Sequence, residues 1–194
     1  MRSTMSAIVV AIALLVVGCA HQINISPPLN TLEGSNVSRI DKVVGYYIAT
    51  SDRAREVSTP GGGGDKVKYF PYQESEPALR QILSNVFTKV IAIPSLTDQQ
   101  FIATNEIVYV FVPAIATDSS SESALTWPPT KFTVTLDCHA VDRSGATVWR
   151  RQVKGEGKAE FSEFKHDLSL AARRASKEAF LNLQKEIHTA PEFR

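Results

Sequence analysis

KFTVTLDCHAVDRSGATVWRRQVKGEG, residues Lys131–Gly157, is the stretch that decides the fold of this 194-residue chain. Apolar and polar residues alternate from Lys131 to Val141, which predicts a strand with one buried face. Asp142-Arg143-Ser144-Gly145 carries Asp first and Gly fourth, as a type I turn does. Residues 146–157 return as the partner strand, so the stretch predicts a β-hairpin. Its apolar face is expected to hold Phe132, Val134, Leu136, Cys138 and Ala140.

The other face of the predicted hairpin is mixed in character. If Gly145 forms a bulge after the turn, Trp149 falls opposite His139. Trp and Arg are common anchors of protein interfaces, so Trp149, Arg151 and His139 are candidate partner-binding residues. The alternative is an ordinary solvated face with a partly shielded tryptophan. The face is expected to hold Thr133, Thr135, Asp137, His139, Trp149 and Arg151.

Two helices with continuous apolar stripes are predicted outside the hairpin. The first opens at Glu76-Pro77 and is stopped by Pro94, and the second runs from near Asp167 to His188. Their spacings of three and four residues mean that each helix packs on something. The stripes are Leu79, Ile82, Leu83, Val86, Phe87 and Val90, and then Ala172, Ala175, Ala179, Phe180, Leu183 and Ile187.

Two further strands are predicted at residues 42–50 and 106–117. Pro113 cannot donate to a ladder, so the second strand should be an edge or bulge there. The order strand, helix, strand, hairpin, helix predicts an α+β fold. We expect a two-layer sandwich, a mostly antiparallel sheet of about four strands with two amphipathic helices on one face.

The N-terminus has the layout of a secretory signal. Arg2 is followed by the apolar run Ala7–Val17, shorter than the roughly 20 residues that span a bilayer. Val16-Val17-Gly18-Cys19 resembles the bacterial lipobox, which implies that Cys19 is acylated and becomes the mature N-terminus. Ala20, rather than an aspartate, resembles the pattern of outer-membrane lipoproteins. The alternative is an unlipidated signal peptide with a chance Gly-Cys.

These features divide the chain into three parts. We expect a signal peptide at 1–18, a lipidated N-terminus and tether at 19–41, and a single periplasmic α+β domain at 42–190. The chain has 21 Lys+Arg and 20 Asp+Glu, and the loss of Arg2 with the signal leaves 20 against 20. A neutral protein has no electrostatic attraction to nucleic acid, so no nucleic-acid partner is expected. With Cys19 acylated, Cys138 has no disulfide partner.

The stretch TPGGGGDKVKYFPY, residues Thr59–Tyr72, raises the question of a phosphate-binding loop. A Walker loop ends in Gly-Lys-Ser/Thr between a strand and a helix, whereas Gly64 is followed by Asp65-Lys66-Val67. We therefore expect no nucleotide and a long mobile loop over residues 51–72. The aromatic residues that follow are either buried under this loop or a tip that docks a partner. They are Tyr69, Phe70 and Tyr72.

Catalytic and metal sites find no support in the motifs. Cys138 and His139 are neighbours on a strand and point to opposite faces, so they cannot form a dyad. Asp137 and His139 share a face, but no third or fourth ligand follows at a recognisable spacing. No catalytic residue, metal or cofactor is expected.

A family resemblance rests on the lipobox VVGC, QINISPPL, the helix SEPALRQILSNVF, the hairpin and the closing helix LAARRASKEAFLNLQKEI. Together they resemble small proteobacterial envelope lipoproteins of the YajG type, the auxiliary lipoproteins of lipid-exporting ABC transporters and the lipopolysaccharide-assembly lipoprotein. The resemblance implies a helix-on-sheet domain and a non-catalytic accessory role in an envelope protein complex. The alternatives are a carrier of lipid or another small apolar ligand and, more remotely, an enzyme. A carrier needs a pocket of several hundred Å³, on the order of 300–1,000.

Overall fold

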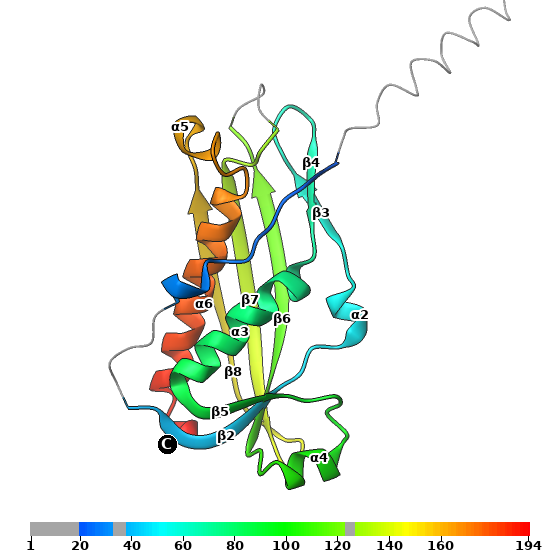
Figure 1. Ribbon diagram of the computed structural model, residues 1–194, viewed down its shortest axis with the longest axis vertical. Helices are drawn as coiled ribbons and strands as arrows, with labels where there is room; N and C mark the ends of the chain where they lie inside the picture. Colours follow the sequence, from blue (N-terminus) through cyan, green and yellow to red (C-terminus); the bar gives the residue numbers. More distant parts are fainter. Residues whose placement is uncertain (1–19, 33–37, 123–126) are drawn as a thin grey trace, which may run out of the picture.

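The computed structural model describes residues 20–32, 38–122 and 127–194, which form an α+β fold with two mixed sheets. Figure 1 shows an elongated molecule, with long strands and two main helices along its length. The strands are β1 (Ala20–Gln22), β2 (Ile40–Tyr46), β3 (Val57–Pro60), β4 (Lys66–Tyr69), β5 (Phe87–Ala92), β6 (Tyr109–Ser120), β7 (Lys131–Asp142) and β8 (Thr147–Lys158). The helices are η2 (Leu29–Thr31), α2 (Thr50–Arg53), α3 (Pro71–Val86), α4 (Gln99–Thr104), α5 (Phe161–Phe164), α6 (Leu170–Thr189) and η3 (Pro191–Phe193).

The larger sheet has five strands in the order β5-β2-β6-β7-β8. β2 pairs in parallel with both β5 and β6, whereas β7 is antiparallel to its two neighbours β6 and β8. The α+β class is confirmed, but the expectation of about four mostly antiparallel strands in one sheet is wrong. The missed strand β5 directly follows α3. Phe87 and Val90 continue the helical spacing of the stripe, so the sequence pattern does not reveal that the helix ends at Val86 and a strand begins.

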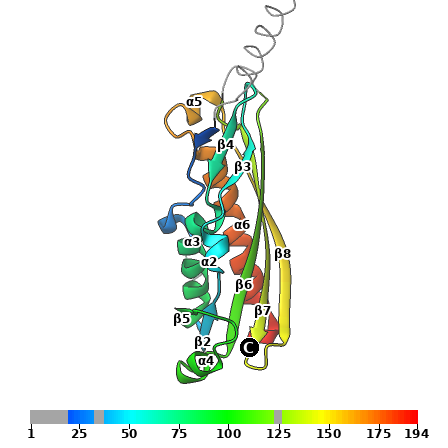
Figure 2. The ribbon, with the colours of Figure 1, turned by 90° about the vertical axis from the view of Figure 1, so that its right-hand side faces the viewer.

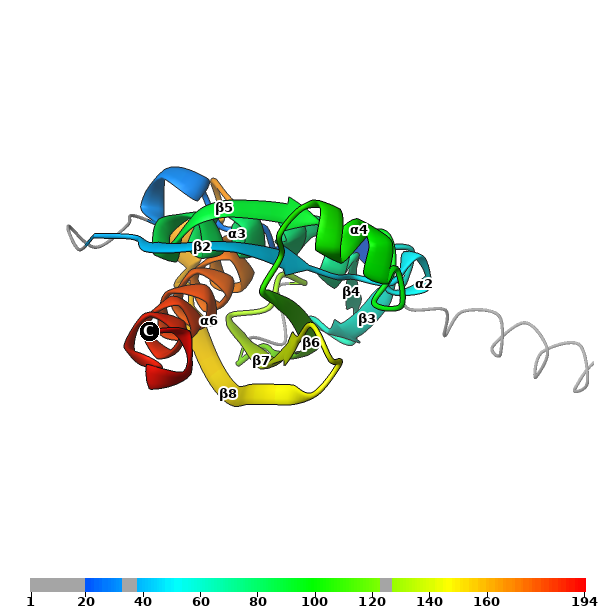
Figure 3. The same cartoon turned by 90° about the horizontal axis from the view of Figure 1, so that it is seen from below.

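The two expected helices both form, and the second buries its whole expected stripe, whereas the first lacks Phe87 and Val90, which lie in β5. α3 buries Leu79, Ile82, Leu83 and Val86, although it begins at Pro71 and carries Pro77 on its exposed side. α6 buries all six residues predicted for the second stripe. Figure 2 shows both helices on the same side of β6, β7 and β8, and Figure 3 shows the sheet curling around them.

The hairpin β7–β8 carries the core of the domain. Phe132, Val134, Leu136, Cys138 and Ala140 are all buried, as the alternation predicted. The turn has Gly145 at φ 84°, and the Asp142 carboxylate accepts hydrogen bonds from the backbone of Ser144 and Ala146. Val141 pairs with Thr147, which is the register expected from this turn.

A second bulge then changes the faces of β8. Ala140 pairs with Trp149, so Val148 is an extra residue on β8 between two paired positions. One inserted residue moves every later side chain of a strand to the opposite face. Arg150, not Trp149, is therefore opposite His139, and the predicted membership of the mixed face is wrong for Trp149 and Arg151.

Pro113 lies in the middle of β6 without disturbing the ladder to β7. β2 pairs with β6 only as far as Phe111, and Ile115 N donates to the hydroxyl of Tyr72 (3.1 Å). Alternate residues of a strand direct their backbone groups to the same side, so the Pro113 nitrogen faces a side where β2 has already ended. The strand is an edge at that point, as its proline predicted.

The smaller sheet has the order β1-β4-β3 and contains the glycine run. β3 and β4 form an antiparallel hairpin, so residues 51–72 are not the long loop that the glycines suggested. Gly61 N donates to Asp65 O (2.9 Å), which closes the turn. Gly63 and Gly64 have φ of 65° and 86°, a conformation that glycine adopts without strain.

Residues 20–32, called here the N-terminal segment, pack on the domain. β1 pairs in parallel with β4, and Ile23 N donates to Lys68 O (3.0 Å). Ile23, Ile25 and Leu32 are buried in the main core. This part of the chain was expected to be a tether in which the alternating residues 22–26 could pair on an edge strand. The same alternation explains why the segment lies on the domain.

Candidate functional site

Trp149, the central residue of the predicted interface, belongs to the core. Its side chain is 2% exposed and lies against the rings of Phe111 and Phe193, with centroids 6.1 and 5.5 Å away. The indole nitrogen has no hydrogen-bond partner among the described residues. A residue packed in this way cannot contact a partner protein, so the interface hypothesis is wrong for Trp149.

Arg151 lies at the rim of the helix-facing side of β8. It pairs in register with Cys138, and its guanidinium stands 6.0 Å from the Trp149 ring centre. Its Nε is 3.6 Å from a carboxylate oxygen of Glu186 on α6. Arg151 is exposed but separated from His139 by the sheet, so the structure does not bring these two candidates together.

The aromatic residues after the glycines are core residues as well. Tyr69 is fully buried and donates its hydroxyl to Thr117 Oγ1 (2.7 Å), and burial raises the pKa of this phenol. Tyr72 is 4% exposed and accepts from Ile115 N. Phe70 is half-buried beside them. The burial alternative was the right one for Tyr69 and Tyr72, and the docking-tip hypothesis is wrong for them.

The surface that remains open on the hairpin is called here the outer face. It consists of the outward side chains of β6, β7 and β8. Arg150 donates two hydrogen bonds to the Asp137 carboxylate (Nε–Oδ1 2.9 Å and Nη2–Oδ2 2.6 Å). These bonds hold the Asp137 pKa below its usual range. The central residues of the outer face are Ala114, Ala116, Thr133, Thr135, Asp137, His139, Arg150, Gln152 and Lys154.

Cys138 behaves as the alternation predicted. Its thiol is buried, and burial raises its pKa to about 12, so it is not a nucleophile near neutral pH. In the described ranges 20–32, 38–122 and 127–194, no cluster of three or more His, Cys, Asp or Glu could hold a metal ion. The described helices include none that is long and apolar enough to cross a membrane.

The N-terminal segment begins at Ala20, the residue after the predicted lipid attachment point. Cys19 itself lies outside the described residues. His21 stacks on Trp127 with ring centroids 4.0 Å apart, and its Nε2 is 3.2 Å from Asp65 Oδ2. The first described residues are therefore fixed beside the β3–β4 turn, at one end of the molecule (Figure 1).

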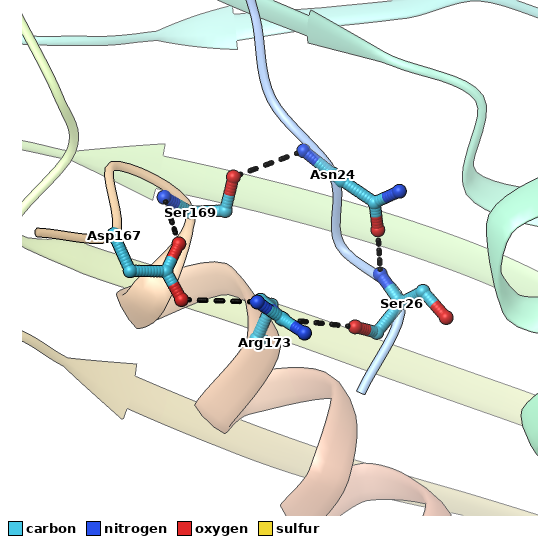
Figure 4. Close-up of polar contacts among 5 residues, drawn as sticks. All are labelled: Asn24, Ser26, Asp167, Ser169 and Arg173. Carbon is cyan, nitrogen blue, oxygen red and sulfur yellow. Dashed lines mark hydrogen bonds and ion pairs between the residues drawn. The ribbon is translucent and has the colours of Figure 1, made fainter. Parts of the chain in front are cut away.

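Further along, the N-terminal segment is clamped to the start of α6 (Figure 4). Asn24 N donates to Ser169 Oγ (3.1 Å), and Arg173 Nε donates to the carbonyl of Ser26 (3.2 Å). Asp167 accepts from both Ser169 N (3.0 Å) and Arg173 Nη1 (3.1 Å). This clamp was not predicted, because its residues are about 145 positions apart in the sequence and follow no local motif.

The backbones of α6 and β8 pack directly against each other. A Cβ added at Gly157 would overlap the carbonyl oxygen of Ala171, and one added at Gly155 would overlap the backbone of Ala175 and Ala179. Small residues on both elements thus let helix and strand backbones touch. The matching signal in the sequence is the pair of alternate glycines in GEG together with the alanines on the helical stripe.

Side chains of α6 also cover the free edge of β8. Glu178 accepts from Glu156 N (2.7 Å), Asn182 donates to Lys154 O (2.9 Å), and Arg174 donates to Lys158 O (2.7 Å). Unpaired strand edges invite pairing with other chains. These contacts therefore protect the C-terminal part of this edge, from Lys154 to Lys158.

Comparisons with known proteins give similarities of structure only. No protein family matches the sequence, and no curated protein does. The chain is similar to a Xanthomonas campestris protein of the DUF330 family, at 11% identity and TM-score 0.46, over 87% of this chain and 91% of that one. It is similar to PelC of Paraburkholderia phytofirmans, solved as a dodecamer, at 13% and 0.44, over 78% and 91%. It is also similar to a proposed lipoprotein of Caulobacter crescentus, at 13% and 0.37, over 68% and 85%.

Proposed function

We propose that this chain is a lipid-anchored lipoprotein of the bacterial envelope, held in the outer membrane through Cys19 and facing the periplasm. Its folded domain is a non-catalytic accessory module that binds a protein of an envelope assembly or transport complex. The observation that carries the proposal is the fixed position of Ala20. The lipobox ends one residue before a strand that is paired on the domain, so acyl chains on Cys19 would hold the domain by one end.

The packing of α6 on β8 favours a scaffold over a carrier. A lipid carrier of this architecture would bind its ligand between helices and sheet, where space is needed. Here Gly155 and Gly157 bring the two backbones into contact, and Phe111, Trp149 and Phe193 fill the far end of the same layer. Opening a ligand site there would require α6 to leave the sheet.

The outer face is the surface that we assign to the protein partner. It is broad, because three long strands contribute to it and the helices lie on the opposite side (Figure 2). Threonine and alanine side chains surround the Asp137–Arg150 pair, which offers hydrogen-bonding groups in a fixed geometry. His139 remains a candidate contact residue, whereas Trp149, Tyr69 and Tyr72 do not.

The anchor is tested with Cys19→Ser in the full chain. We expect the unaltered protein to carry acyl groups on its N-terminal peptide, measured by mass spectrometry, and to sediment with outer membranes. Cys19→Ser should lose both properties, because a single residue provides the attachment. Unchanged membrane association of the variant, or an unacylated N-terminal peptide in the native protein, would contradict the proposal.

The partner surface is tested by crosslinking in native membranes. A photo-crosslinking amino acid at Thr135, in the middle of the outer face, should trap a discrete protein that mass spectrometry identifies. The same amino acid at Lys185, exposed on α6, is the matched control and should not trap it. Equal products from both sites, or no product from Thr135, would show that the outer face is only solvated.

A further inference from the structure

Large apolar side chains are exposed at only three places in the described ranges, and two of these places are close together. Phe161 is 65% exposed and Leu168 is 42% exposed, and the third is Leu29 at 42%. Phe161 and Leu168 belong to residues 160–169, called here the α5 segment. Single exposed apolar residues are ordinary on protein surfaces. The α5 segment is distinguished by the contacts that hold it on the domain and by the end of the molecule at which it lies.

The α5 segment is fixed to the domain, so Phe161 is presented in a defined direction. Phe164 is buried at 4% exposure and packs edge-on against Phe161, with centroids 5.5 Å apart. Glu160 and Glu163 form a capping box around the short helix. Arg174 of α6 then holds the Glu163 carboxylate through two hydrogen bonds of 2.7 and 3.1 Å. An exposed phenylalanine on a mobile loop would have no such support.

The α5 segment lies at the same end of the molecule as the predicted anchor. Ser169, at its C-terminal limit, accepts the hydrogen bond from Asn24, which is five residues after Cys19. Five residues of extended chain reach at most about 18 Å. In Figures 1 and 2, α5, the β3–β4 turn and the start of the described chain lie together at one end, with α4 at the other.

A cleft beside Phe161 adds charged groups to this end. It has a volume of about 360 Å³, and Phe161 and Phe164 form its apolar part. The cleft is also lined by Lys131 and Lys158 and by the carboxylates of Glu122 and Glu160, and Lys131 is ion-paired with Glu122. An apolar side chain with amines beside it suits the boundary between lipid headgroups and acyl chains, where aromatic and basic residues gather.

We propose that the α5 segment is a membrane-contact site, with Phe161 buried in the interfacial layer of the bilayer that anchors Cys19. The inference rests on the proposed acylation, because the anchor brings this end of the molecule to the lipid. Contact through both the acyl chains and Phe161 would set the tilt of the domain. The long axis then points away from the membrane, which leaves the outer face accessible from the side.

The experiment uses the full acylated chain in vesicles of phosphatidylethanolamine and phosphatidylglycerol. An environment-sensitive fluorophore is attached to Ser162→Cys, which retains Phe161, and separately to Gln100→Cys on α4 as the matched control. Both sites are exposed, and the native Cys138 is buried with a pKa of about 12, so it does not compete for the label. We expect a blue-shifted emission at position 162 that lipids brominated in their acyl chains quench, and neither effect at position 100.

A second variant tests the role of the phenylalanine itself. Phe161→Ser combined with Ser162→Cys should lose the blue shift and the quenching while the protein still floats with the vesicles. Flotation with a water-like emission at position 162 when Phe161 is present would overturn the inference and leave the proposed anchor intact. A chain that is not acylated and does not float would overturn both. Equal quenching with and without Phe161 would show that the residue is not the contact.

Discussion

Gly155 and Gly157 decide how closely α6 approaches the sheet. We predict that Gly157→Ala lowers the free energy of unfolding by about 1–3 kcal/mol, because the methyl group meets the Ala171 carbonyl and forces helix and strand apart. For a domain of this size each kcal/mol corresponds to roughly 2–4 °C in melting temperature. Thermal unfolding followed by circular dichroism measures the change. Gln152→Ala, exposed on the same strand, is the control and should match the unaltered protein.

Trp149 gives a second prediction at the residue scale. Trp149→Ala should destabilise the domain by about 3–5 kcal/mol, because it leaves a cavity between Phe111 and Phe193. Trp149→Phe should lose much less, because it retains a ring and removes an indole N–H that has no partner within the described residues. Chemical denaturation of both variants checks the order. Equal and small losses would mean that the residue is not packed as described.

The glycine run gives a prediction at the scale of one hairpin. Replacing Gly61–Gly64 with four serines should destabilise the protein by about 2–4 kcal/mol, because two positions require positive φ, at roughly 1–2 kcal/mol each. A side chain at Gly61 also meets the carbonyl of Trp127. Asn at positions 63 and 64 alone should be better tolerated, since Asn adopts this conformation more readily. A melting temperature unaffected by the serines would contradict the observed turn.

Acid should loosen the attachment of α5. Hydrogen bonds from Arg174 and the backbone of Glu160 lower the pKa of Glu163 to about 2, from an ordinary 4.5. A depressed pKa means that the ionised form is favoured by folding, so this contribution is complete above about 4.5 and disappears as the pH falls toward 2. The melting-temperature difference between unaltered protein and Glu163→Gln should therefore shrink over that interval. A melting-temperature difference that stays constant as the pH falls through this interval would contradict the prediction.

The elements that could be predicted from the sequence are those with long, uninterrupted periodicity. The alternation of β7 and the alanine-rich stripe of α6 each specified one buried face, and the structure has both. The prediction of element boundaries and strand faces failed where a helix is followed directly by a strand and where a bulge shifts the register. Phe87 and Val90 fit a helix but lie in β5, and the bulge at Val148 moved Trp149 into the core through the displacement of one residue. In the core Trp149 packs against Phe193, a contact that no local pattern contains.

At the scale of the whole molecule, both ends of the described chain enter the core. Phe193 is fully buried and contacts the rings of Phe87, Phe111 and Trp149. The expected domain limit at residue 190 therefore omits a core residue. We predict that deletion of residues 191–194 destabilises the protein by about 3–5 kcal/mol, as the loss of a buried aromatic side chain does. Glu192→Ala is the control, and denaturation curves that coincide for the deletion and the control would contradict the prediction.

The candidate site illustrates the same limit on sequence reasoning. His139 could be placed on an open face because the alternation of a single strand was enough. The clamp that joins Asn24 to Ser169 and Ser26 to Arg173 could not be predicted, because its two segments are 145–147 residues apart in the sequence. The lipobox is independent of folding, so it predicts the anchor but not what the anchored end looks like.

The parallel pairing of β1 with β4 decides how the domain would resist mechanical force. If the acyl chains hold Cys19 while a bound partner moves, tension enters the fold at Ala20 and runs along β1. The β1–β4 hydrogen bonds lie across this direction and are sheared together, rather than opened one after another. Beyond them, the clamp on Arg173 carries the remaining tension to the start of α6. Tension on the membrane anchor would reach the core only after the β1–β4 hydrogen bonds and the clamp had both broken.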